Sequence, residues 1–247
     1  MFIWGCPRSG TTLLKSLLVT HPALGGTLRE STGIFNIRDI FEFGLDEMSS
    51  DEMTALLSES NDIIEFYDRV ADALLTQSRK TVFVDKLQPR GYRLAYVLRR
   101  FPESRFVNIV RDGRDCYCSA LRHPGVAQSR SIARFAQYWQ SCVGLPATLV
   151  PENRRITITY ETLTSQPRVW LPRVMEFLGL DFLEQQIVVE HYAQTNNLGK
   201  VPWHQNLARP INTNSHGRWR KELTVAQNAE FCRIAESALV QHGYVLG

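Results

Sequence analysis

The 247-residue sequence has little cysteine, and its five cysteines lack the paired spacing of a zinc site. Their number is odd, and they are scattered at Cys6, Cys116, Cys118, Cys142 and Cys232. This usage excludes the disulfide framework of a small secreted domain and suits a reducing compartment. We therefore expect a cytoplasmic protein, and an anchor preceding the given sequence is left open.

The sequence also lacks a long apolar run and a strong excess of charge of one sign. No stretch approaches the roughly 18 consecutive apolar residues of a membrane span, so we expect none. The net charge is only +3, from 28 basic and 25 acidic side chains, and no basic block predicts nucleic acid as a partner. With 44% hydrophobic residues, the chain can bury a large core, and we expect one domain over residues 1–247.

Strand-like apolar runs alternate with helical patterns along the chain. Buried strands are predicted at 2–4, 81–85, 105–110 and 156–160, and helical spacing recurs at 13–18, 47–79, 94–101, 118–121, 132–149, 170–178 and 225–242. This alternation predicts a three-layer α/β sandwich, with a mostly parallel central sheet and helices on both faces. The polar residues 196–217 predict a long loop, and long loops often carry function.

Residues 5–12, GCPRSGTT, follow the first strand with the spacing of a phosphate-binding P-loop. A loop between a strand and a helix directs backbone N–H groups and the positive end of the helix dipole at an anion. The usual lysine is absent, because Thr11 stands in its place, and a cation is present at Arg8 instead. A guanidinium binds a tetrahedral oxyanion through two hydrogen bonds without a metal. The alternative is a tight turn with chance glycines.

A second basic motif, RDGRDCYCS, follows the strand predicted at 105–110. Arg111 at the strand end and Ser119 on the next helix can converge on one phosphate. The alternative for Arg111 is a surface ion pair with Asp112 or Asp115. We expect Arg114 and Asp115 to be helix-start and ion-pair residues.

Four segments together resemble the sulfotransferases that use 3′-phosphoadenosine 5′-phosphosulfate (PAPS), especially the tyrosylprotein sulfotransferases and a related bacterial group. They are GCPRSGTTLLKSLLVTHP, VDKLQPRGYRLAYVLRRFPESRFVNIVRDGRDCYCSALR, ITITYETL and NTNSHGRWRKEL. Their order and approximate spacing agree with that family over nearly the whole chain. The resemblance implies a P-loop-type fold and sulfuryl transfer from PAPS, with PAP as product and no required metal.

The resemblance also implies a set of residues that bind the donor. Arg111 and Ser119 would hold its 3′-phosphate, which ATP lacks. The full set is Arg8, Ser9, Gly10, Thr11, Thr12, Arg111, Ser119, Tyr160, Gly217 and Arg218. Tyr160 is expected at a strand end, where an ordinary aromatic is equally compatible, and Trp219 is expected to be a core anchor. The tyrosylprotein pattern has a further arginine where this chain has His123, with Arg122 beside it, and that contact is left open.

Three catalytic residues follow from the same resemblance. Lys86 would stabilise the bridging oxygen of the leaving phosphate, together with Arg8 at the sulfuryl group. Glu30 would take the proton of the acceptor hydroxyl as general base. The alternatives are a solvated Lys86 paired with Asp85 and an exposed loop glutamate at position 30. A histidine base is also open, although the six histidines match no base motif.

Two other functions stay open at this stage. The residues VFVD at 82–85 superficially resemble a strand that ends in a magnesium-binding aspartate, as in a nucleotide kinase or NTPase. A non-catalytic nucleotide-binding protein of the same fold is the other alternative. For a sulfotransferase, the hydroxyl acceptor is not specified by the sequence: peptide tyrosine, a carbohydrate, a lipid and a small molecule all remain open.

Overall fold

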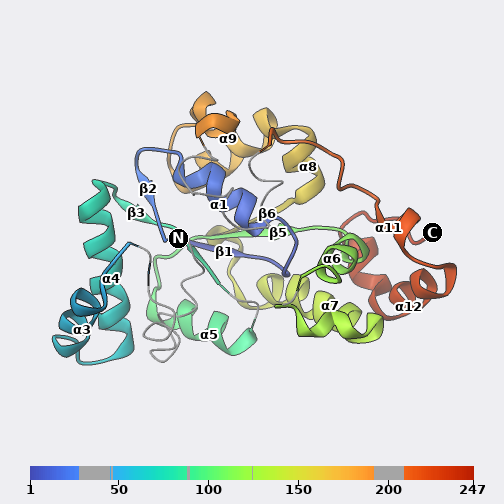
Figure 1. Ribbon diagram of the computed structural model, residues 1–247, viewed down its shortest axis with the longest axis horizontal. Helices are drawn as coiled ribbons and strands as arrows, with labels where there is room; N and C mark the ends of the chain where they lie inside the picture. The colour runs from blue at the N-terminus through green and yellow to red at the C-terminus, as the bar shows by residue number, and fades with distance from the viewer. Residues whose placement is uncertain (28–44, 46, 88–89, 124, 192–208) are drawn as a thin grey trace.

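The centre of the protein is a parallel four-stranded sheet (Figure 1). The computed structural model describes residues 1–27, 45, 47–87, 90–123, 125–191 and 209–247. The strands lie in the order β4-β1-β5-β6, with bounds β1 Phe2–Trp4, β4 Asp85–Lys86, β5 Phe106–Val110 and β6 Arg155–Thr159. Because all pairs are parallel, the carboxyl ends of the strands meet at one edge, where α/β proteins bind ligands.

Helices cover both faces of this sheet, so the predicted three-layer α/β class is confirmed. One face carries the helices α1 (Thr11–Val19), α8 (Tyr160–Ser165) and α9 (Pro167–Leu178). Ile3, Val107 and Ile109 belong to the buried cluster on this side. Their alternation with residues of the other face is the period-2 pattern of a strand.

The opposite face is covered by α4 (Ile63–Ser78), α5 (Gly91–Arg100) and α7 (Ile132–Leu149), and α3 (Ser50–Ser58) packs beside α4. Phe2, Trp4 and Phe106 are buried here. The indole N–H of Trp4 donates to the carbonyl of Cys142 on α7 at 2.7 Å, which satisfies the one polar atom of this side chain.

The remaining helices and turns complete the described part of the chain. Helix α12 packs along α7, and α11 packs on α6. Their bounds are α6 Gly113–Ala120, α11 Trp219–Glu222 and α12 Val225–Gln241, with 3₁₀ turns η2 Ala127–Arg130, η3 Glu152–Arg154 and η4 Glu184–Ile187. Among the described residues, no helix has the length and apolarity needed to cross a membrane.

Two details of the predicted strands are wrong. The strand expected at 81–85 is divided: β3 (Val82–Phe83) pairs with β2 (Leu24–Gly25) in a separate two-stranded sheet, and only β4 joins the central sheet. The apolar run of the sequence carries no sign that β3 and β4 pair with different strands. Tyr160 does not end a strand, because β6 stops at Thr159 and Tyr160 is the first residue of α8. The Thr159 hydroxyl caps that helix by accepting from the N–H of Thr162.

Candidate functional site

The glycine loop joins β1 to α1 in a conformation that requires glycine at Gly10. Both Arg8 (φ 73°) and Gly10 (φ 97°) are left-handed, and a Cβ at Gly10 would lie 2.5 Å from Cδ2 of Tyr160. The N–H of Ser9 donates to the carbonyl of Cys6 at 3.0 Å, which closes the turn. The loop therefore leads directly into the first turn of α1 with the backbone lying close against Tyr160.

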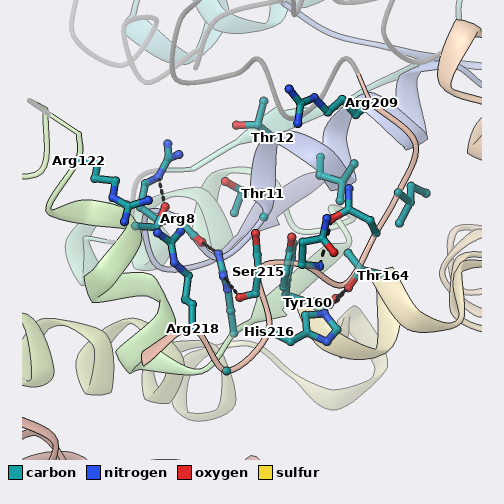
Figure 2. Close-up of a pocket in the computed structure, with 18 of the residues that line it drawn as sticks. Arg8, Thr11, Thr12, Arg122, Tyr160, Thr164, Arg209, Ser215, His216 and Arg218 are labelled. Carbon is teal, nitrogen blue, oxygen red and sulfur yellow. Dashed lines mark hydrogen bonds between the residues drawn. The ribbon is translucent and has the colours of Figure 1, made fainter. Parts of the chain in front are cut away.

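A pocket of about 580 Å³ opens over this loop. Figure 2 shows Arg8, Arg122 and Arg218 on one side, and Tyr160, Thr164 and His216 on the other. Among the described residues, six cationic side chains line it, and they are Arg8, Arg111, Arg122, Arg209, Arg218 and Lys221. A concave site with this charge attracts polyanions, because field lines concentrate in a cleft of one sign.

Arg111 leaves the end of β5 and is buried, with 4% of its surface exposed. Its Nη1 donates to the carbonyl of Arg8 at 3.1 Å and its Nη2 to the carbonyl of Ser215 at 2.5 Å. Its guanidinium lies 4.4 Å from the ring centre of Tyr160. Its buried Nε has no hydrogen-bond acceptor among the described residues. The alternative of a surface ion pair is wrong: Asp115 is 3.9 Å away, but both groups are buried.

Ser119 and Arg8 meet at the other side of the pocket. The Nε of Arg8 donates to the Ser119 hydroxyl at 3.1 Å, across 111 positions of the sequence. Both residues line the same pocket as Arg111. The structure thus brings together the arginine of the glycine loop and the two residues predicted to converge on one phosphate.

Lys86 lies in β4, beside the glycine loop. Its Nζ donates to the hydroxyl of Thr12 at 3.1 Å, and the residue is 9% exposed. The alternative of a solvated lysine is therefore wrong. Thr12 itself lines the pocket, so the ammonium of Lys86 contacts a residue of the pocket wall.

Asp85, the residue that superficially matched a magnesium aspartate, is fully buried. Its carboxylate accepts hydrogen bonds from the Tyr67 hydroxyl at 3.1 Å and the Lys86 N–H at 2.5 Å. Burial raises the pKa of Asp85, and the charge of Lys15 and the bond from Tyr67 oppose that rise. Across the described residues, no cluster of His, Cys, Asp or Glu has the arrangement of a metal site. Asp85 is thus a buried residue of β4 whose carboxylate is bonded to Tyr67 and to the Lys86 N–H.

The late loop around Gly217 forms a further wall of the pocket. Gly217 has φ 62°, and its N–H donates to Asp115 Oδ2 at 2.7 Å, while the Trp219 N–H donates to Oδ1 at 3.0 Å. Asp115 is thus more than a helix-start residue, since it anchors this loop. Arg218 lines the pocket, and its Nε lies 2.8 Å from Glu222 Oε1.

Two buried residues, Arg114 and Trp219, pack against each other next to this loop. Trp219 is 5% exposed, as expected for a core anchor, and lies between the guanidinium groups of Arg114 (3.7 Å from the ring centre) and Arg220 (4.4 Å). Arg114 is fully buried and pairs with Asp112 at 2.8 Å, which confirms its predicted ion pair. It also donates to the carbonyls of Val245 and Leu246, so the same guanidinium holds the end of the chain.

Sequence reasoning missed a neutral polar pair on the Tyr160 side of the pocket. Nε2 of His216 lies 2.7 Å from the Thr164 hydroxyl, which also bonds to the Tyr160 carbonyl at 2.8 Å. The His216 ring packs edge-on against Tyr160. Burial, together with the charge of Arg111, lowers the pKa of His216. His216 lies in the segment NTNSHGRWRKEL, but nothing in the sequence predicted that it pairs with Thr164.

Other residues line the pocket without an individual role predicted from the sequence: Asn212, Asn214, Lys221 and Glu222 of the segment NTNSHGRWRKEL, and Arg209 outside it. Arg122, whose role the sequence left open, lines the pocket as well. Of the predicted donor-binding residues, Ser9 is buried within the loop and its hydroxyl has no partner in the described part of the chain. The nine others line the pocket: Arg8, Gly10, Thr11, Thr12, Arg111, Ser119, Tyr160, Gly217 and Arg218. Glu30 lies outside the described residues.

Along its sequence, the chain is similar to two protein-tyrosine sulfotransferases and a nodulation protein. Protein-tyrosine sulfotransferase 1 of Danio rerio is 23% identical over an alignment of 273 positions. The alignment covers 99% of this chain and 72% of that protein. Nodulation protein NoeE of Sinorhizobium fredii is 24% identical over 98% of this chain and 65% of its own length. The chain spans 62% of protein-tyrosine sulfotransferase 2 of Gallus gallus, at 24% identity.

Solved structures with the same fold include the sulfotransferase domain of the Synechococcus PCC 7002 olefin synthase. It has a TM-score of 0.66 and 23% identity, and the match covers 96% of this chain and 93% of that one. Mouse sulfotransferase SULT7A1, solved in complex with PAP, matches with a TM-score of 0.56 and 15% identity over 97% of this chain and 83% of its own. A family model described as the sulfotransferase family matches residues 1–184. The chain therefore belongs to the sulfotransferase family.

Proposed function

We propose that this chain, acting as one domain over residues 1–247, transfers the sulfuryl group of PAPS to a hydroxyl of an acceptor. The observation that carries the proposal is the buried Nε of Arg111, which has no acceptor among the described residues and lies in the wall of a cationic pocket above a glycine loop without lysine. A buried donor without an acceptor is costly, and a ligand oxyanion would satisfy it. The solved complex of mouse SULT7A1 with PAP supports this class of ligand.

The residues present offer donors for both charged groups of such a nucleotide. Arg8 and the N-terminal turn of α1 would offer a guanidinium and backbone N–H groups for the 5′-phosphosulfate. Beside Arg8, Arg111 and Ser119 would offer donors for the 3′-phosphate. Tyr160 provides an aromatic surface between the glycine loop and the late loop, where Gly217 and Arg218 complete the site.

The transfer breaks the bond between sulfur and the bridging oxygen, whose electron pair remains on the departing phosphate. Lys86 would stabilise the negative charge that develops on this oxygen, since its Nζ already contacts Thr12 at the first turn of α1. The acceptor oxygen forms the new bond to sulfur, and its proton passes to Glu30 in this proposal. Arg8 would hold the sulfuryl oxygens in line with the acceptor. None of these steps assigns a role to a metal, and the absence of a metal requirement stays a prediction.

Titration calorimetry with PAP and with ATP, each with and without magnesium, tests the cofactor class. We expect magnesium-independent binding of PAP, much tighter than that of ATP, and its loss in Arg111→Ala. Preference for ATP with magnesium would overturn the proposal in favour of a nucleotide kinase or NTPase.

Chemistry is tested separately with sulfur-labelled PAPS and a panel of acceptors that contains a tyrosine peptide, a carbohydrate, a hydroxylated lipid and a small alcohol. Transfer of label to one class identifies the acceptor. Tight PAP binding without transfer to any acceptor in the panel would favour a non-catalytic nucleotide-binding protein. The cytoplasmic location stays a prediction.

A further inference from the structure

Glu222 is the one carboxylate among the described residues that line the pocket, where six side chains are cationic. A negative charge in the wall weakens the attraction between the pocket and an anionic ligand. A carboxylate at this position therefore opposes the binding of an anion by the six cations.

The Glu222 carboxylate binds two arginines of the pocket at once. Its Oε1 and Oε2 accept from Nε and Nη2 of Arg218 at 2.8 and 3.2 Å, and Oε1 lies 3.4 Å from Nη2 of Arg122. Arg218 is the N-cap of α11, the helix that Glu222 ends, whereas Arg122 follows α6. One carboxylate thus occupies guanidinium groups from two separate elements.

The carboxylate is charged at neutral pH and only partly screened by water. Burial opposes its ionisation, but the bond from Arg218 and the charge of Arg122 lower the pKa of Glu222 below its usual value. The Glu222 side chain is 27% exposed and that of Arg218 is 19% exposed, while Arg122 reaches further into solvent at 69%. The Glu222–Arg218 contact is therefore the stronger of the two.

We propose that Glu222 is a resident anion that competes with a ligand phosphate for Arg218 and Arg122. The inference rests on the proposed function, because it takes PAP as the ligand. Without nucleotide, the carboxylate offsets repulsion among the clustered cations. When the nucleotide binds, its phosphate takes over part of this role, so Glu222 lowers the affinity for polyanions that reach this side of the pocket.

The ligand group most affected is the one near Ser119. Arg122 follows Ser119 by three positions at the end of α6, and Arg8 contacts the Ser119 hydroxyl. In the proposed function, Ser119 holds the 3′-phosphate. Removing the charge of Glu222 should therefore strengthen the binding of PAP more than that of adenosine 5′-phosphate, which lacks this group.

Calorimetric titration of the wild type, Glu222→Gln and Glu230→Gln with both nucleotides tests the proposal. Glu230 is an exposed carboxylate on α12 outside the pocket, so its substitution matches the change in net charge. We expect Glu222→Gln to bind PAP roughly 3- to 10-fold more tightly and adenosine 5′-phosphate within about 2-fold of wild type. Glu230→Gln should leave both affinities unchanged.

Thermal unfolding gives a second, independent readout. Without ligand, Glu222→Gln should melt below the wild type, because the cations lose their counter-charge. Saturating PAP should raise its melting temperature by more than it raises that of the wild type, since tighter binding stabilises the folded state further. If the substitution only destabilised the fold, the variant would show a lower melting temperature without ligand and a smaller increase on adding PAP than the wild type.

The double variant Arg218→Ala/Glu222→Gln, compared with Arg218→Ala, tests the route of the competition. The gain in PAP affinity should shrink to about 2-fold or less, because the guanidinium for which both anions compete is gone. An undiminished gain would overturn the role of Arg218. Unchanged or weaker PAP binding by Glu222→Gln, with normal wild-type binding, would overturn this inference alone. Failure of the wild type to bind PAP would overturn the proposed function and this inference with it.

Discussion

Arg111 and Asp115 hold the loop at residues 215–219 through opposite kinds of backbone group. Arg111 donates to the Ser215 carbonyl at 2.5 Å, and Asp115 accepts from the N–H groups of Gly217 and Trp219 at 2.7 and 3.0 Å. The two side chains lie 3.9 Å apart. Since Arg111 also donates to the carbonyl of Arg8, the glycine loop and the late loop are joined through one guanidinium.

Asp115→Asn should therefore weaken PAP binding by roughly 10- to 100-fold. The amide NH₂ that replaces one carboxylate oxygen faces a backbone N–H, and two donors cannot form a hydrogen bond with each other. Calorimetry measures the affinity, and hydrogen exchange at Gly217 and Trp219 should show faster exchange of these two amides. Asp51→Asn, at an exposed position of α3, is the matched control. Wild-type affinity together with faster exchange would refute the link between loop anchoring and binding.

Lys86→Met should lower turnover by at least about 100-fold and leave PAP affinity within a few-fold. Methionine fills a similar volume but removes the charge that would stabilise the leaving oxygen. The measurement is kcat with the acceptor that the panel identifies, together with calorimetric PAP binding on the same preparation. Equal losses in binding and turnover would assign Lys86 to ground-state binding instead.

Two glycine-to-alanine variants should have opposite effects on stability. Gly10→Ala should cost roughly 1–3 kcal/mol of unfolding free energy, because it combines a left-handed backbone with a contact of 2.5 Å to Tyr160. Gly144→Ala, within α7, meets no atom within 4 Å and should stabilise by roughly 0.5–1 kcal/mol. Urea denaturation measures both, and a stability loss in both variants would contradict the assignment.

The unfolding free energy should decrease as the pH falls through about 6.5, the pKa of an unfolded histidine. Burial lowers the pKa values of His21, His216 and His242 in the folded protein. The folded state thus binds fewer protons than the unfolded state in this range, and acid favours unfolding. Urea titrations at about pH 7.5, 6.5 and 5.5 should show a shallower decline for His216→Gln than for the wild type. Identical slopes would mean that His216 contributes nothing to this linkage.

Local pattern was enough to predict the layers of the fold, and motifs that resemble the sulfotransferases named nine residues that line the pocket. Helix and strand periodicities depend on near neighbours, so α7 and α12 lie close to the ranges expected for them. The glycine loop is likewise a continuous segment with its own backbone requirements. Arg111, Ser119 and Tyr160 could be assigned to the same pocket because each lies in a motif that the sequence carries intact.

The tertiary structure decided the contacts that depend on the path of the chain. Asp115 meets Gly217 across 102 positions and Thr164 meets His216 across 52, and neither pair has a local signal. The same holds for β3 and β4, where neighbouring residues join different sheets. The sequence by itself determined the fold class and the loop chemistry, because periodicity and glycine requirements are local. Only the packed structure determined which charges the pocket arginines contact, since that depends on which elements lie side by side.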